Sequence, residues 1–304
     1  MKADVNLISN DGKFDSVKRF VLFFASGRSG HTWLGAILDA APNAMIANQR
    51  NTLKDYFYKM NPDDRSRNRL YEFLAYNSWH CGNSPEGWVQ VYNYTIPGLW
   101  QGRIDTSNNE QLEVIGDKSG GGAIHILKKW IKEVAGKDFD LAFGDYDAVP
   151  GLVDYVNKKL EEYISVIQAE PKFIVNIRHP GNIVATSETR HHAGELKKLS
   201  AARAYGVLGR IRSSLWVMEN VGKKEYWHLV VTEKFAMDTE EELIKMCDFV
   251  GLSCPQLMID TVVNQTHHSV HETWKNVAWE REFLVSYNDF ITKYLSEWYQ
   301  PMCQ

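Results

Sequence analysis

The 304-residue sequence has few cysteines and no long apolar segment. Its four cysteines, Cys81, Cys247, Cys254 and Cys303, contain no Cys-x-x-Cys pair, which argues against a disulfide scaffold and predicts reduced thiols. No apolar window has the length that a bilayer-spanning helix needs, and the acid-containing N-terminal segment lacks the apolar core of a secretion signal. We therefore expect a cytoplasmic protein that does not act at a membrane.

The sequence also lacks an excess of positive charge. Its 34 lysines and arginines are mixed with 38 acids for a net charge of -4, which gives no support for nucleic-acid binding. The histidine clusters, 191–192 and 267–271, have no cysteine or acid at metal-ligand spacing, so we expect no metal site. No repeat and no Gly/Ser/Pro-rich linker interrupts the chain, and we expect one domain over residues 1–304.

Apolar runs alternate with segments of helical spacing. The runs at 18–25, 111–116, 171–178 and 226–233 are typical of buried strands, and helices are predicted at 32–40, 123–137, 197–221 and 240–251. This order predicts an α/β fold of three layers, a P-loop-type parallel sheet with helices on both faces. Residues 50–110, rich in Trp and Tyr, are expected to be an insertion that either lines an acceptor pocket or only covers the side of the core.

The first predicted strand breaks into Ala25-Ser-Gly-Arg-Ser-Gly-His-Thr32 before a helix begins. Small residues at the carboxyl end of a strand, followed by a helix N-terminus, favour binding of a phosphate-like anion. An ATP-binding loop would carry Lys where this sequence has His31, and it would begin with Gly where this sequence has Ala25. Arg28 can supply the fixed charge instead, because a guanidinium holds phosphate or sulfate oxygens in a bidentate manner. An ordinary strand–turn–helix junction is the alternative.

A second basic motif follows the strand at 171–178. Arg178 ends this strand, and hydroxyls follow at Thr186 and Ser187 in the next predicted helix. An Arg and a hydroxyl in this arrangement can hold one phosphate from two sides. Taken alone, this stretch is better explained as an Arg that caps the sheet edge and a hydroxyl in the first turns of a helix.

Together, the two motifs resemble a known family. GRSGHTWLGAILDAAPNA resembles the 5′-phosphosulfate loop, and RHPGNIVATS the 3′-phosphate motif, of sulfotransferases that use 3′-phosphoadenosine 5′-phosphosulfate (PAPS). VTEKFAMDTEEELIKMCDFVGLS is similar to the C-terminal strand and helix of that family, and the resemblance covers most of the chain outside residues 50–110. It implies sulfuryl transfer from PAPS to a hydroxyl or amine, with 3′,5′-ADP as the second product and no metal requirement.

The resemblance also implies roles for individual residues. The 5′-phosphosulfate would contact Arg28, Ser29, Gly30, His31 and Thr32, while Trp33 would flank the adenine or simply fill the core. The 3′-phosphate would be held by Arg178 with Thr186 or Ser187. Lys118, in a Gly-Asp-Lys-Ser turn expected after a strand, would face the sulfuryl group and, with Arg28, neutralise the charge of the leaving phosphate. Without that role, Lys118 would be a solvated turn lysine.

The sequence departs from the family at the general base. Some members have a glutamate where this chain has Asn48 and Gln49, and an amide cannot accept a proton. Asp117 and His31 are equal candidates, and His80 is a third. An acceptor with a nitrogen nucleophile could manage with a weaker base.

The acceptor is expected to be a small molecule, such as a specialised metabolite or an alkaloid or guanidinium toxin, and the protein a monomer or homodimer. Two other functions stay open from the sequence. One is a P-loop kinase-like enzyme that uses a nucleoside triphosphate, for which Asp117 is the contender as magnesium ligand. The other is a non-catalytic protein that keeps a nucleotide-binding fold.

Overall fold

The computed structural model describes residues 14–48, 51–76, 112–119, 121–142, 144–191 and 201–266, together with positions 288, 291, 292 and 296. Within these residues, five strands form a parallel sheet in the order β2-β3-β1-β4-β5. They are β1 Arg19–Ala25, β2 Ala44–Asn48, β3 Val114–Lys118, β4 Glu170–Ile177 and β5 Trp227–Val231. Because all five run in one direction, the loops that follow them gather at one edge of the sheet.

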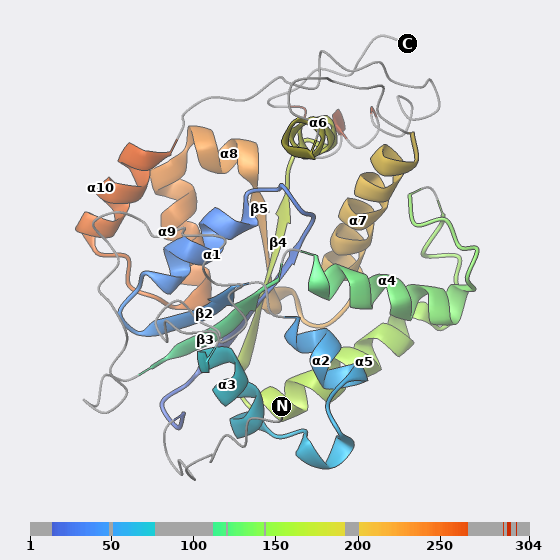
Figure 1. Ribbon diagram of the computed structural model, residues 1–304, viewed down its shortest axis with the longest axis horizontal. Helices are drawn as coiled ribbons and strands as arrows, with labels where there is room; N and C mark the ends of the chain where they lie inside the picture. Colours follow the sequence, from blue (N-terminus) through green and yellow to red (C-terminus); the bar gives the residue numbers. More distant parts are fainter. Residues whose placement is uncertain are drawn as a thin grey trace.

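Helices cover both faces of this sheet, as the sequence predicted (Figure 1). On one face lie α1 His31–Asp39, α8 Thr232–Met237, α9 Thr239–Val250 and α10 Gln256–Gln265. The other face carries α2 Thr52–Tyr58, α3 Arg67–Tyr76, α4 Gly122–Ala135, α5 Leu152–Ile167 and α7 Ala201–Asn220. The helix α6 Pro180–His191 follows the carboxyl end of β4. The fold is therefore a three-layer α/β fold of the P-loop type.

The apolar run of β1 is continuous because its two faces are both buried. Val21 and Phe23 pack into the core beneath α1 and α9, whereas Leu22 and Phe24 pack into the core beneath α4 and α7. None of these four side chains is more than 1% exposed. A central parallel strand of this kind fixes the position of the loop that follows it.

Several elements were not predicted from the sequence, among them β2, α2, α3, α5, α8 and α10. The strand β2 is only five residues long and pairs with β3 alone, and α5 begins after a glycine in the left-handed region, Gly151, with φ of 72°. The expected end of β3 at residue 116 was also wrong. This strand continues through Asp117 and Lys118, so these residues lie in the sheet rather than in a turn.

The expected insertion at 50–110 is described only over residues 51–76. There it forms α2, the short helix η1 Pro62–Asp64, and α3. Tyr56 and Tyr71 are buried in the core, and the Tyr71 hydroxyl donates to the carbonyl of Ile167 over 2.6 Å. This part of the segment covers the side of the core. Its remainder, with His80, lies outside the described residues.

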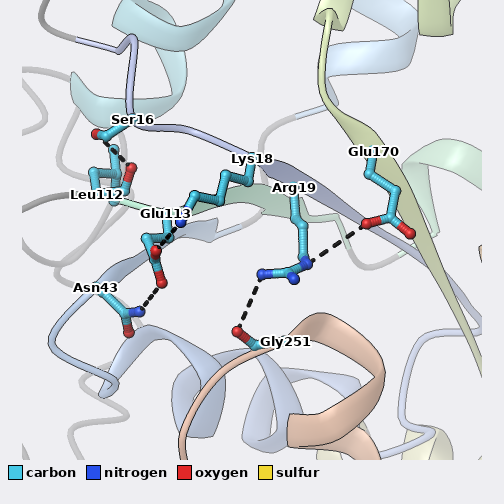
Figure 2. A network of polar contacts seen from close by, with 8 residues as sticks. All are labelled: Ser16, Lys18, Arg19, Asn43, Leu112, Glu113, Glu170 and Gly251. Carbon is cyan, nitrogen blue, oxygen red and sulfur yellow. Dashed lines mark hydrogen bonds and ion pairs between the residues drawn. The ribbon is translucent and has the colours of Figure 1, made fainter.

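The amino edge of the sheet is held by a network of polar contacts (Figure 2). Glu113, just before β3, accepts hydrogen bonds from Lys18 and from the Asn43 amide, the latter over 2.8 Å. Arg19 at the start of β1 pairs with Glu170 over 3.6 Å and donates to the carbonyl of Gly251 over 3.2 Å. These contacts bind three neighbouring strands together at the edge opposite the predicted phosphate loop.

Cys247 at the end of α9 and Cys254 before α10 lie next to each other, with Cα atoms 6.2 Å apart, a separation that a disulfide can bridge. Of the helices in the described residues, none combines the length and apolar character that crossing a bilayer would need.

Candidate functional site: an anion-binding loop after the first strand

The loop from Ser26 to Gly30 joins β1 to α1 at the carboxyl edge of the sheet. Two of its residues have left-handed backbone conformations, Arg28 with φ of 70° and Gly30 with φ of 88°. The first turn of α1 has no side-chain cap and no acidic residue. The free N–H groups and the positive end of the helix dipole therefore face this loop without a competing protein anion.

Polar contacts from distant segments hold the loop in place. The Thr232 hydroxyl, at the start of α8, donates to the carbonyl of Ser29, and the Asn176 amide of β4 donates to the Thr232 hydroxyl over 3.1 Å. The Arg210 guanidinium of α7 donates to the Ser26 hydroxyl over 3.1 Å. Sequence reasoning missed Asn176, Thr232 and Arg210. The only local signal for Arg210 was a charged residue within the apolar face of its helix.

The two motifs identified in the sequence lie side by side. Arg178, one residue after β4, donates a hydrogen bond to the carbonyl of Arg28 over 3.0 Å. Both side chains are half-buried. Since 150 residues separate them, only the parallel pairing of β1 with β4 brings them together.

The hydroxyls predicted to assist Arg178 lie on α6. Thr186 is half-buried, and its hydroxyl donates to the carbonyl of Asn182 over 2.7 Å. The side chain of Ser187 lies outside the described part of the structure. Trp33 is partly buried and packs against the core beneath α1, as a core-filling tryptophan would.

His31 begins α1 and is 4% exposed. Its Nδ1 lies 3.1 Å from the Ser29 hydroxyl. Burial, together with the positive charges of Lys118 and Arg28, lowers the pKa of His31 to about 3. The imidazole is therefore neutral near pH 7, and its weak basicity disfavours the role of general base.

Lys118 reaches the same loop from the end of β3. Its side chain is only 1% exposed, and its ammonium donates to the Thr32 hydroxyl over 3.0 Å. Gly35 of α1 provides the space, because a Cβ there would lie 2.7 Å from Cγ of Lys118. Burial lowers the pKa of Lys118 to about 7, with an opposing effect of Asp117. The alternative of a solvated turn lysine is wrong.

Asp117, the neighbouring residue, points to the opposite face of the sheet, as alternation along a strand requires. Its Oδ2 accepts from the backbone N–H and the hydroxyl of Thr52, over 2.9 and 2.7 Å, at the start of α2. Its Oδ1 has no partner among the described residues. Burial raises the pKa of Asp117 to about 7. The carboxyl therefore fixes α2 from the face that α1 and Lys118 do not occupy.

Taken together, four basic side chains from separate segments surround one short loop. They are Arg28 in the loop, Lys118 of β3, Arg178 after β4 and Arg210 of α7. Within the described ranges, no group of three or more His, Cys, Asp or Glu side chains is arranged to hold a metal ion. The side chain of Asn48 and all of Gln49 lie outside the description. Such an array of cations and backbone N–H groups suits an oxyanion with several charges.

Comparison with known proteins gives only distant similarities. No protein-family model and no curated protein matches the sequence. Among solved structures, the chain is similar to the sulfotransferase domain of the Synechococcus PCC 7002 olefin synthase, with 16% identity, coverage of 90% of this chain and 94% of that one, and a TM-score of 0.45.

Two further solved structures show the same level of similarity. For the sulfotransferase domain from the curacin biosynthetic pathway, identity is 13%, coverage 94% and 99%, and the TM-score 0.46. For mouse sulfotransferase SULT7A1 complexed with PAP, identity is 11%, coverage 91% and 84%, and the TM-score 0.38. These scores are too low to carry an argument about activity, which must come from the geometry of the loop.

Proposed function

We propose that this chain is a sulfotransferase that moves a sulfuryl group from PAPS to a hydroxyl or amine of a small molecule. The observation that carries the proposal is the hydrogen bond between Arg178 and the carbonyl of Arg28, which places a second arginine beside the phosphate loop. Two arginines on one side and Lys118 on the other fit a ligand with phosphates at two positions and a further charged group.

In this proposal, the N–H groups of the loop and of the first turn of α1 bind the 5′-phosphosulfate, with Arg28 beside them. Arg178 binds the 3′-phosphate on the side of the loop next to β4, and Thr186 donates to it when its hydroxyl turns away from the Asn182 carbonyl. Lys118 lies on the other side, next to β3, and its ammonium is positioned by Thr32 at the first turn of α1. The first turn of α1 contains no acidic side chain that would repel the phosphosulfate, so its N–H groups can bind that anion.

The reaction requires positioning and charge neutralisation more than covalent participation of the protein. The acceptor oxygen or nitrogen forms a bond to sulfur, while the bond from sulfur to the bridging phosphate oxygen breaks. The electron pair of that bond stays on the phosphate of 3′,5′-ADP, where Lys118 and Arg28 stabilise the developing charge. The proton of the acceptor passes to a base or to water. His31, with its pKa of about 3, serves better as a hydrogen-bonding residue than as that base.

The kinase-like alternative is less consistent with the site. His31 occupies the position of the phosphate-binding lysine, and it is neutral near pH 7. Asp117, the contender for magnesium, is bound to Thr52 on the other face of the sheet. A P-loop enzyme needs its magnesium ligands beside the phosphates.

Thermal unfolding distinguishes the two functions. In a buffer with a chelator and no magnesium, 3′,5′-ADP at about 100 times its Kd should raise the Tm by roughly 5 °C. Arg28→Ala should abolish most of this rise. A Tm that rises with magnesium-ATP but not with 3′,5′-ADP would overturn the proposal.

A further inference from the structure

Basic side chains from three helices gather on one side of the phosphate loop. They are Lys54 of α2, His125 and Lys128 of α4, and Arg210 of α7. The helix α4 packs against both α2 and α7 (Figure 1). Arg210 connects the group to the loop through its 3.1 Å hydrogen bond to Ser26. We call these four residues the basic cluster.

The start of α4 and the start of α2 are in close contact. A Cβ on Gly122 would lie 2.4 Å from Cγ of Asn51, so the first turns of the two helices touch. Lys54 lies about one helical turn after Asn51, and His125 lies about one turn after Gly122. Both residues are therefore about one turn away from this contact. Desolvation lowers the pKa of His125, and the positive charges of Lys128, Arg210 and Lys54 lower it further.

Among the described residues, no acid forms an ion pair with any member of the basic cluster. Several lysines elsewhere do have such partners, for example Lys59 with Asp55 over 2.7 Å and Lys172 with Glu170 over 2.7 Å. Like charges held close together repel one another. Burial and the positive charges of Arg210 and Lys132 also lower the pKa of Lys128. An arrangement of this kind is stabilised when an anion binds.

We propose that Lys54, His125, Lys128 and Arg210 bind an oxyanion of the acceptor, such as a carboxylate, phosphate or sulfate group. The role as an acceptor site rests on the proposed sulfotransferase function. In the described part of the chain, the donor loop shares only Arg210 with this cluster, through the hydrogen bond of Arg210 to Ser26. Arg178 and Thr186 follow β4, whereas α4 follows β3 on the other side of β1. An acceptor anchored at α4 would approach the loop from the sheet face that carries α2, α4 and α7, opposite the face on which Lys118 contacts α1.

This site changes the expected class of acceptor. A guanidinium or alkaloid cation, considered from the sequence, would be repelled by the positive charges of Lys54, Lys128 and Arg210. An acceptor with an acidic group would be attracted to them and steered toward the loop at low salt. The cluster therefore selects acceptors by charge. The sulfuryl group is transferred to the hydroxyl or amine of the acceptor that lies in line with it.

Calorimetric titration of the full chain with inorganic pyrophosphate tests the inference, after the donor loop has been saturated with 3′,5′-ADP. Pyrophosphate should still bind, and its affinity should fall as salt increases. The double variant Lys54→Gln/Lys128→Gln should weaken this binding about tenfold or more, with 3′,5′-ADP affinity unchanged. The matched control is Lys129→Gln, because Lys129 neighbours Lys128 but lies over the ring of Tyr58, 3.4 Å from its centroid. This control should bind pyrophosphate as the wild type does.

The outcomes separate the two proposals. If 3′,5′-ADP binds but pyrophosphate does not, or if Lys129→Gln weakens pyrophosphate binding as much as the double variant, the acceptor-anion site is wrong and the sulfotransferase proposal stands. If 3′,5′-ADP itself does not bind, the sulfotransferase proposal fails, and the acceptor role of the basic cluster fails with it.

Discussion

The ammonium of Lys118 donates a hydrogen bond to the hydroxyl of Thr32 over 3.0 Å, which connects the end of β3 to the first turn of α1. The contact is partly buried between the sheet and the helix, where Gly35 leaves room for the aliphatic part of the lysine. A cation that would otherwise be costly to bury is thus held beside the positive end of a helix. We expect the Lys118 ammonium and the N-terminus of α1 to be most stable in this arrangement when an anion is bound beside both.

Gly35→Ala should disturb this packing. The new Cβ would lie 2.7 Å from Cγ and 3.0 Å from Cβ of Lys118. Overpacking of this kind costs about 1–3 kcal/mol, against a gain of about 1 kcal/mol from helix propensity. We expect a net loss of about 1 kcal/mol in the free energy of unfolding, measured with urea. Gly27→Ala is the control, since its Cβ would meet nothing within 4 Å. A Gly35→Ala variant more stable than the wild type would contradict this view of the packing.

Two substitutions of Arg28 separate its charge from its backbone conformation. Arg28 has φ of 70°, a conformation that glycine adopts without the cost of about 1–2 kcal/mol that other residues incur. Arg28→Ala and Arg28→Gly should therefore weaken 3′,5′-ADP binding equally, whereas Arg28→Gly should be about 1 kcal/mol more stable to urea. Equal stability of the two variants would show that the left-handed conformation is absent in solution.

Asp117 should make the protein less stable as the pH rises from 5 to 7. Its pKa is raised from 3.8 to about 7, so the folded state binds more protons than the unfolded state in this range. The stabilisation is complete below the unfolded pKa and is lost as the pH approaches 7. Asp117→Asn keeps an oxygen that accepts from Thr52 and should reduce this fall by on the order of 2 kcal/mol.

Urea unfolding of the wild type and Asp117→Asn at several pH values measures this difference. Contributions of other groups are common to the two proteins and cancel. Lys118, whose pKa is lowered to about 7, affects stability mainly above this range and with the opposite sign. Parallel pH profiles for the two proteins would refute the raised pKa of Asp117.

Arg178→Ala should remove selectivity for the 3′-phosphate. The wild type should bind 3′,5′-ADP at least tenfold more tightly than 5′-AMP, because a hydrogen bond to a charged group contributes about 1.5–3 kcal/mol. In Arg178→Ala the two affinities should converge, mainly through weaker binding of 3′,5′-ADP. If both ligands lost affinity by the same factor, Arg178 would act on the loop through the Arg28 carbonyl rather than on the 3′-phosphate.

The sequence was sufficient for the central part of the fold. The junction of β1, loop and α1 was predicted because its signals are local: an apolar run, small residues and then helical spacing. The strand β2 and helix α5 were missed. A run of five residues such as Ala44–Asn48 becomes a strand only by pairing with β3, which lies about 70 residues further along the chain.

The site was harder to predict than the fold, because its parts come from distant segments. Arg28, Lys118 and Arg178 were found through motifs at strand ends. Arg210 reaches Ser26 across 184 residues, and no pattern in the sequence indicates that contact. Because Lys118 and Asp117 were predicted to lie in a turn, their opposite orientation was missed. Both residues belong to β3, where adjacent side chains face opposite sides of the sheet.

Transfer of the sulfuryl group itself is the most direct test of the central claim. PAPS carrying radiolabelled sulfate is incubated with the protein and a set of phenols and alcohols that also carry a carboxylate, phosphate or sulfate group. This reaction should give a labelled acceptor and 3′,5′-ADP. Lys118→Met should slow this transfer by about 100-fold, while 3′,5′-ADP still binds, and Lys129→Met should not change it. Tight 3′,5′-ADP binding without any transfer would identify a non-catalytic nucleotide-binding protein, and transfer by Lys118→Met at the wild-type rate would contradict the role assigned to Lys118.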